Sequence, residues 1–387
     1  MDGDGLRPRV ALGTIARDWT RLGFIGFGGP PSHIALLRRL CVERHDYLDP
    51  AEFEDAIAAT SLLPGPASTQ LAIYCAWRLR GARGALIGGL GFILPGLIFI
   101  TALSALFLAH DPPRAVLGFA AGAGALVPSV ALRASTQLVP SSWQRAGKTR
   151  DARFRWALYA ALGALSAAAF GAFVVLVLIA CGAMELLIRT PPRDGGRHLL
   201  VPALTAPVLG LSGLAALSWV ALRVGALSYG GGFVIIPLMQ HDVVTTYHWM
   251  SGGQFLNAVA LGQVTPGPVV LTVAVVGFAV GGVGGAALAA FVAFAPSFLM
   301  VIVAGPRFEQ LRHSRRASSF LAGAGPCVVG AIAGSSIPLA LSLARGWQFA
   351  ILAGGLLWFF AFRRGVVLGL LGAGLVGLVV VVAGGGT

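Results

Sequence analysis

Five long apolar stretches limit what this chain can fold into. Each reaches or approaches the ~20 residues that a helix needs to cross a bilayer. Only 11% of the residues are charged, whereas a soluble domain carries about 25%. The sequence therefore predicts an all-α polytopic membrane protein. The stretches are residues 84–109, 115–139, 156–188, 286–304 and 365–383.

The remaining composition narrows the function classes. The net charge of +13 suits the basic cytoplasmic loops of a membrane protein and gives mild support to an anionic substrate, so we expect no nucleic-acid partner. The four cysteines stand singly, without a Cys-x-x-Cys pair or a His at ligand spacing, which predicts no metal, cofactor or disulfide framework. Arg17 and Asp18 interrupt the first apolar run before any cleavage site, so we expect no cleaved signal peptide.

An internal repeat divides the chain into two halves. Pro64-Gly65-Pro66 recurs 202 positions later as Pro266-Gly267-Pro268, and the same shift maps Arg21 to Arg223 and Gly28-Gly29 to Gly230-Gly231. An ordered series of this kind predicts a tandem duplication, with one repeat in residues 1–198 and the other in residues 199–387.

The positions of Lys and Arg predict that the repeats have opposite orientations. Residues 38–49, 78–83 and 141–155 are basic and are predicted to be cytoplasmic, whereas residues 240–250 and 280–285 contain neither Lys nor Arg. Conversely, residues 307–316 hold four arginines. We expect about five crossings in each half, the first made by a broken helix, because an odd number inverts the second repeat.

The Pro-Gly-Pro segments are expected to turn inside the membrane. On either side of the first, residues 51–63 and 67–79 would each form only ~20 Å of helix, too short for a ~30 Å hydrocarbon core. Residues 51–79 are therefore predicted to enter and leave on one side as a re-entrant hairpin, with residues 252–280 as the inverted copy. The glycine segments Phe27–Pro31 and Tyr229–Gly232 are predicted to break the first helix of each half.

These four breaks are the predicted substrate site, because secondary transporters with inverted repeats bind substrate where helices break near the midplane. Free N–H groups and the positive end of a helix suit a divalent oxyanion; close helix packing is the alternative role for the same glycines. The predicted substrate-binding residues are Arg21, Gly28, Gly29, Pro64, Gly65, Pro66, Ser68, Thr69, Gln70, Arg223, Gly230, Gly231, Gln263, Thr265, Pro266, Gly267 and Pro268.

Charged residues near the breaks have two interpretations each. Arg21 and Arg223 lie in apolar sequence, where they either bind oxyanion in a two-pronged manner or extend to the interface. Candidates for binding a coupling proton or cation lie mainly in the first hairpin, which begins with acidic residues where the second has Gln254 and Asn257. Helix capping is the alternative role of these acidic residues. His33 titrates near neutrality or has a structural role. The coupling candidates are His33, Glu52, Glu54, Asp55 and Asn257.

At these residues the sequence resembles the chromate ion transporter family, over roughly residues 17–344. Leu94-Pro95-Gly96 in the first half is only partly repeated by Ala295-Pro296-Ser297 in the second. The resemblance implies a two-domain, inverted-repeat carrier of the bacterial inner membrane that expels chromate. The matching motifs are Phe27-Gly28-Gly29-Pro30, Glu52-Phe53, Pro64-Gly65-Pro66, Gly230-Gly231-Gly232-Phe233, Gly262-Gln263 and Pro266-Gly267-Pro268.

Other functions remain open at this point. Sulfate shares the charge and shape of chromate, so a sulfate or other oxyanion permease is one alternative, and a passive anion channel is another. No His-Glu-x-x-His or Gly-x-Ser-x-Gly motif is present, so we expect no enzyme activity. The expected partners are a small oxyanion and membrane lipid, and a homodimer is left open.

Overall fold

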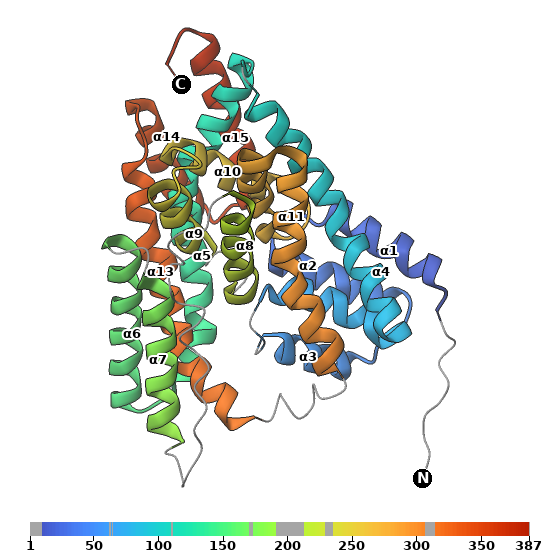
Figure 1. Cartoon of the computed structure of the whole chain (residues 1–387). Helices are drawn as coiled ribbons and strands as arrows, with labels where there is room; N and C mark the ends of the chain where they lie inside the picture. Colours follow the sequence, from blue (N-terminus) through green and yellow to red (C-terminus); the bar gives the residue numbers. More distant parts are fainter. Residues whose placement is uncertain are drawn as a thin grey trace, which may run out of the picture.

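The computed structural model describes residues 10–61, 63, 65–109, 111–169, 173–190, 213–228, 235–305 and 314–386, and their regular structure is entirely helical (Figure 1). The elements of the first half are α1 (Leu12–Ile25), α2 (Pro30–Arg38), η1 (Arg39–Arg44), α3 (Pro50–Thr60), α4 (Ala67–Phe107), α5 (Arg114–Ala146), α6 (Arg150–Ala169) and α7 (Val174–Arg189). Those of the second half are α8 (Gly213–Leu227), α9 (Ile235–Gln240), η4 (His241–Thr246), α10 (Gly252–Val264), η5 (Val269–Leu271), α11 (Thr272–Ala304), α13 (Arg315–Leu341), α14 (Gly346–Leu356), η7 (Leu357–Ala361) and α15 (Val366–Val382).

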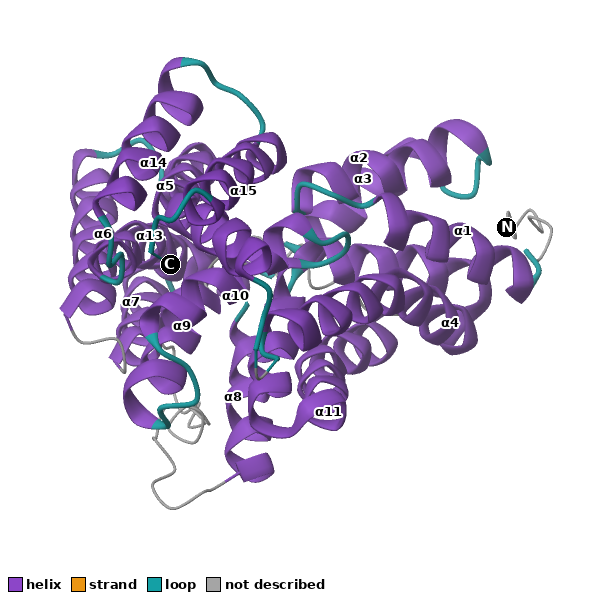
Figure 2. Cartoon of the chain, turned by 90° about the horizontal axis from the view of Figure 1, so that it is seen from above, coloured by secondary structure: helices purple, strands orange, loops and turns teal. Residues whose placement is uncertain are grey.

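The helices form two groups, which are visible from above in Figure 2. The hairpin group contains α1–α4 and α8–α11, with α4 packed against α11. The bundle group contains α5–α7 and α13–α15. In the bundle the halves exchange partners, because α5 packs against α14 and α15 while α13 packs against α6 and α7. Neither half therefore buries its apolar surface by itself.

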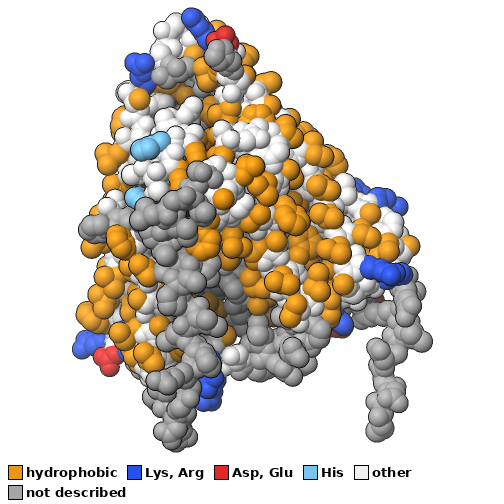
Figure 3. Space-filling model, in the orientation of Figure 1, with side chains coloured by type: hydrophobic (Ala, Val, Ile, Leu, Met, Phe, Trp, Pro, Cys, Tyr) orange, Lys and Arg blue, Asp and Glu red, His pale blue; other side chains and the backbone are white. Residues whose placement is uncertain are grey.

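The protein is an integral membrane protein. Among the described residues, four helical segments are long and apolar enough to cross a bilayer. The face in Figure 3 is hydrophobic across its middle, with Lys and Arg at its edges. Large side chains such as Phe291 (75% exposed) and Ile98 (68% exposed) cover the outside, as lipid contact requires. The four segments are Ala67–Phe107, Arg114–Ala146, Val269–Val303 and Arg315–Leu341.

Both long helices of the hairpin group contain a sharp turn at the predicted end of a hairpin. In α4 the backbone leaves helical geometry at Arg80 and Gly81, where Gly81 has φ 57° and ψ −147°. In α11 the same happens at Gly281 and Gly282, where Gly282 has φ 58° and ψ −146°. Only glycine adopts such angles without strain. The short helices on each side of the Pro-Gly-Pro segments form as predicted.

Other local details recur with the shift of 202. Each half has a short π-helix, η1 or η4, followed by a residue with positive φ, Asp46 (49°) or His248 (51°). Two aromatic rings then stack, His45 on Tyr47 in the first half and Tyr247 on Trp249 in the second. The duplication seen in the sequence thus extends to the backbone.

The prediction that the first helix continues across its glycine break is wrong, because the chain reverses there. Gly28 (φ 91°) and Gly29 (φ 76°) reverse the chain, so that α2 and η1 return alongside α1. Asp18 Oδ2, early in α1, lies 4.0 Å from His45 Nε2, just after η1, while Ile25 at the end of α1 shares a pocket with Leu36 of α2. Two successive residues with positive φ turn the chain back, whereas a kink would only offset two halves of one rod.

The outer parts of α4 and α11 run in opposite directions. Gly305, at the end of α11, packs against Trp77, beside the turn from which the outer part of α4 starts. Further along both helices, Phe298 packs against Gly89. This antiparallel contact is what inverted repeats require, while the number of crossings and their sides in the membrane remain predictions.

Candidate functional site

Three turns meet inside the hairpin group: the turn Gly26–Gly29 and the two Pro-Gly-Pro turns. We call these three turns the tips. The Gly267 N–H donates a hydrogen bond of 2.8 Å to the Gly26 carbonyl. The same carbonyl accepts from His33 Nε2 at 3.0 Å, and His33 Nδ1 lies 3.2 Å from Ser68 Oγ. Three of the four predicted breaks are therefore joined by hydrogen bonds. The fourth, with Gly230 and Gly231, lies outside the described residues, as does Pro64.

Each Pro-Gly-Pro turn packs against the long helix of the other half. A Cβ on Gly96 would lie 2.3 Å from the Pro266 carbonyl oxygen, and a Cβ on Gly65 would lie 3.2 Å from Ser297 Oγ. Gly96 and Ser297 occupy corresponding positions, directly after Pro95 and Pro296. Both turns require glycine, because φ is 120° at Gly65 and 97° at Gly267. Any movement of one half at the tips therefore affects the other.

Neutral hydrogen-bond donors are buried at and next to the tips. The hydroxyls of Thr69 and Ser297, both 0% exposed, have no hydrogen-bond partner, and neither does the amide nitrogen of Gln263. Such groups are costly to bury unless something binds them. Pro66 precedes α4, so Thr69 lies in the first turn of a helix whose N-terminal end is electropositive. These neutral groups are candidates for binding an anion.

The other predicted polar residues are engaged within the protein. The Thr265 hydroxyl donates to the Leu261 carbonyl at 2.9 Å, and Ser68 is bonded to His33. Gln70 is fully buried, and a Cβ on Gly65 would lie 2.5 Å from its amide nitrogen. The sequence analysis missed Ser297, although the incomplete match of Ala295-Pro296-Ser297 to Leu94-Pro95-Gly96 was the available signal.

The two equivalent arginines have different environments. Arg223 is 7% exposed and its guanidinium donates to Asp242 Oδ2 at 2.9 Å. Arg21 is exposed and lines a pocket with Arg39 and Arg44. The structure therefore brings neither guanidinium into the hydrogen bonds of the tips, and the interpretation as a matched oxyanion clamp gains no support from this arrangement.

Two of the acidic coupling candidates are ion-paired. Glu52 of α3 binds Arg78 of α4, and Glu54 Oε1 lies 2.5 Å from Arg38 Nη1. These pairs fasten α3 to its neighbours within the first half. Asp55 is partly buried on the same helix. His33 reaches the tips, through Gly26 and Ser68.

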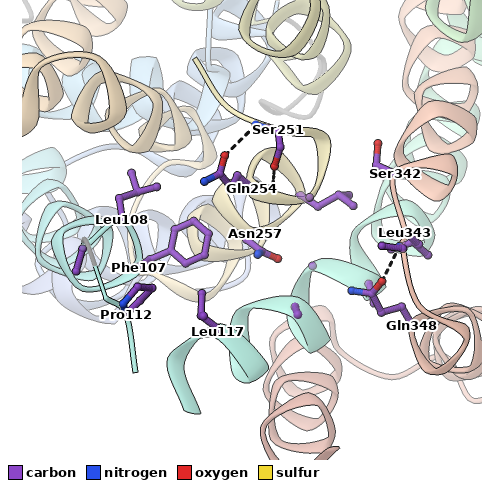
Figure 4. Close-up of a pocket in the computed structure, with 17 residues that line it drawn as sticks. Phe107, Leu108, Pro112, Leu117, Ser251, Gln254, Asn257, Ser342, Leu343 and Gln348 are labelled. Carbon is purple, nitrogen blue, oxygen red and sulfur yellow. Dashed lines mark hydrogen bonds between the residues drawn. The ribbon is translucent and has the colours of Figure 1, made fainter. Parts of the chain in front are cut away.

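Asn257 lies in a cavity of about 460 Å³ that both halves line (Figure 4). Its amide packs against Gly124 of α5, where a Cβ would lie 2.4 Å from Asn257 Oδ1. Around it the cavity has polar side chains from α10 and its N-cap, from the residue after α13 and from α14. Sequence reasoning could not find this cavity, because its walls come from three distant parts of the chain, within residues 107–125, 251–257 and 342–348. The polar lining residues are Ser251, Gln254, Asn257, Ser342 and Gln348.

Comparison with known proteins identifies the family. The sequence model of the chromate transporter family matches residues 13–186 and 215–378. The chain belongs to the chromate transporter family. The two matched segments fall on either side of the connection between α7 and α8 and so follow the repeat division.

Relatives cover most of the chain. It is 29% identical over 342 residues to the chromate transport protein of Cupriavidus metallidurans, covering 86% of this chain and 84% of the relative. The chromate transport protein of Pseudomonas aeruginosa is 28% identical, covering 97% of this chain and 94% of its own. A probable chromate transport protein of Synechococcus elongatus is 29% identical, covering 87% and 88%. No solved structure matches the chain.

Proposed function

We propose that this protein is a carrier that moves chromate out of the cell across the bacterial inner membrane. The observation that carries this proposal is the hydrogen bond between Gly267 and Gly26, because it joins breaks from both halves at one place. Broken helices meeting inside a membrane protein must be buried or line a wet cavity, and transporters use such places to bind ions.

Chromate is a divalent tetrahedral oxyanion, and the tips offer donors that suit its oxygens. Thr69 and Ser297 have buried hydroxyls without partners, and Gln263 has a free amide nitrogen. Hydrogen bonds to a charged acceptor are worth about 1.5–3 kcal/mol each. A few neutral donors hold the ion while it is dehydrated and still release it, whereas a pair of buried arginines would bind it more permanently. The same donors fit sulfate, which is therefore the alternative substrate.

Contacts between the two groups of helices support an alternating-access cycle. Helix α10 packs against α5, with Asn257 against Gly124. Its counterpart α3 packs extensively only against α4 among the described elements, and Gly325, the counterpart of Gly124, lies nearest to Ser142. One end of the hairpin group is thus sealed against the bundle group and the other is not. We propose that the cycle exchanges these two arrangements, with α3 sealing against α13 when α10 separates from α5.

Coupling is assigned to His33 in this scheme. Its Nε2–H donates to the Gly26 carbonyl, so in the neutral ring Nδ1 accepts from the Ser68 hydroxyl. Protonation would turn Nδ1 into a donor and bring a positive charge to the tips, next to the proposed anion. A proton carried with the anion is the simplest coupling that this geometry permits. The anion and proton together keep one negative charge, so the inside-negative membrane potential drives them out of the cell.

Reconstitution tests the proposal. Purified protein in liposomes is expected to accumulate labelled chromate against its gradient when a proton gradient is imposed, and to exclude it when the gradient is reversed. Flux that only follows the chromate gradient would identify a passive anion channel. Competition with sulfate ranks the two substrates. Preference for sulfate with no chromate flux would assign the protein to the sulfate permeases.

Sidedness has its own test. Tags near Lys148, in the basic connection between α5 and α6, are expected to report the cytoplasm, and tags at Thr246 the opposite side. Both tags on one side would contradict the inverted arrangement of the repeats, whatever the substrate is.

A further inference from the structure

A second cavity, of about 450 Å³, lies between α1 and α2–η1 and is lined by residues of both. One part of its wall is charged and holds three arginines and two carboxylates. The other part is apolar. The lining residues are Asp18, Arg21, Leu22, Ile25, Leu36, Arg39, Leu40, Glu43 and Arg44.

The carboxylates of this pocket lie next to basic side chains other than the three pocket arginines. Asp18 Oδ1 accepts from Arg17 Nε at 3.1 Å, and its Oδ2 lies 4.0 Å from His45. Glu43 Oε1 lies 4.0 Å from Arg38 Nε. In contrast, none of the described carboxylates forms an ion pair with the three pocket arginines, and all three are exposed. The pocket therefore presents unpaired guanidinium groups that are free to bind an anion.

The apolar part of the wall continues onto the surface. Leu22 and Ile25 of α1 face Leu36 and Leu40 inside the pocket. At the end of α1, Phe24 is 48% exposed and Ile25 47%. A small hydrated oxyanion gains no binding free energy from an apolar wall, whereas the acyl chains of a lipid gain it by leaving water.

We propose that this pocket binds the phosphate head group of an anionic phospholipid, with the acyl chains along the exposed end of α1. Arginine suits phosphate because its planar fork donates two parallel hydrogen bonds. Basic pockets between membrane helices bind such head groups in the cytoplasmic leaflet, which is the side predicted for the basic loop after α2.

At the corresponding described positions the second half lacks the basic residues of this pocket, which makes the proposal specific to the first half. At the positions that correspond to Arg39 and Arg44 it has His241 and Thr246. Its equivalent of Arg21 is Arg223, which is buried and bound to Asp242. One lipid in one leaflet is therefore expected for each chain.

Native mass spectrometry of the detergent-purified full chain tests the site by titration with phosphatidylglycerol and, separately, with zwitterionic phosphatidylcholine. One phosphatidylglycerol is expected to bind in preference. The double change Arg39→Gln and Arg44→Gln should weaken that binding by about 30-fold, since each arginine near a phosphate contributes about fivefold. Both side chains are exposed, so the fold should be retained. Lysine at both positions should restore most of the affinity.

The matched control is Arg315→Gln with Arg316→Gln, which removes the same charge from exposed positions of α13 outside the pocket. Equal phosphatidylglycerol binding by both double variants would overturn the proposal. So would displacement of the lipid by inorganic phosphate or sulfate at concentrations well below those that strip lipid from the control, because that result would identify a site for a free oxyanion. Lipid binding is measured without transport, so failure here leaves the proposed function untouched.

Discussion

The two halves share one backbone design but place it in different surroundings. At the second half, α10 is sealed against α5, and Asn257 fills the space that Gly124 leaves. At the first half, α3 is held by its own arginine pairs, Glu52 with Arg78 and Glu54 with Arg38, and has no comparable contact with α13 among the described residues. Equivalent positions in the two halves therefore have different contacts, and the proposed carrier cycle rests on that difference.

The arginine pair gives a second comparison at equivalent positions. In the second half, Asp242 compensates the buried Arg223. In the first half, Leu40 occupies the position equivalent to Asp242, and Arg21 is exposed. One arginine therefore stabilises the fold, while the other is available for a ligand. The predictions below test how far these differences extend, beginning with the position where both halves should respond most.

Replacing either tip glycine with Val should abolish transport while leaving the protein inserted. Gly65 (φ 120°) and Gly267 (φ 97°) have backbone angles that a β-branched residue does not adopt without strain. Ala should distinguish the two positions and reduce transport more at Gly65. A Cβ at Gly65 would lie 2.5 Å from Gln70 Nε2, whereas one at Gly267 would lie 3.3 Å from its nearest atom, in Leu271. The measurement is chromate flux per inserted molecule.

The control for these variants is Gly372→Val in α15, where no atom lies within 4 Å of the added Cβ. It should transport normally. Full specific activity of Gly65→Val and Gly267→Val would remove the Pro-Gly-Pro turns from the substrate path.

Arg223→Gln should destabilise the protein by about 3 kcal/mol, because it leaves the Asp242 carboxylate buried without its partner. Arg21→Gln should leave stability unchanged. Adding Asp242→Leu to Arg223→Gln gives the second half the residue that the first half has at position 40, and should recover most of the loss. Thermal unfolding in detergent measures all three. An equal loss of stability in Arg21→Gln would contradict the different roles assigned to the two arginines.

Thr69→Val and Ser297→Ala should each raise the chromate KM by about tenfold, the low end of what a hydrogen bond to a charged group contributes. Both hydroxyls are buried without partners, so their removal should not lower the unfolding temperature. Thr265→Val is the matched control, since that hydroxyl is already bound to the Leu261 carbonyl, and its effect on KM should be smaller. A KM unchanged in Thr69→Val and Ser297→Ala would place the substrate elsewhere.

Sequence patterns predicted the local elements well and their spatial relations less well. The short helices around Pro-Gly-Pro follow from length and flanking charge, and the break at Gly28-Gly29 follows from residue type. The direction of the chain after that break did not, because it depends on φ values of 91° and 76° that a glycine pair permits but does not impose. Likewise the pairing of Arg223 with Asp242 joins α8 to η4 across 19 positions, and no local pattern marks it.

The smallest effect is expected when cross-linking compares the contact of α5 with α10 and the contact of α13 with α3, here called the two seals. The comparison tests whether one seal closes as the other opens. Cysteines at Ala121 and Asn257 would report the closed contact of α5 with α10, since both residues line the same cavity. Their counterparts, Ala322 and Asp55, would report contact of α13 with α3.

In a background that lacks the four native cysteines, a short bifunctional maleimide should link the first pair efficiently and the second pair poorly. Sulfate has the charge and shape of chromate without oxidising thiols, so adding it should raise the second yield a few-fold and lower the first. Yields that stay fixed in both pairs would mean that the two seals do not alternate, and a channel or a one-sided gate would then explain transport better.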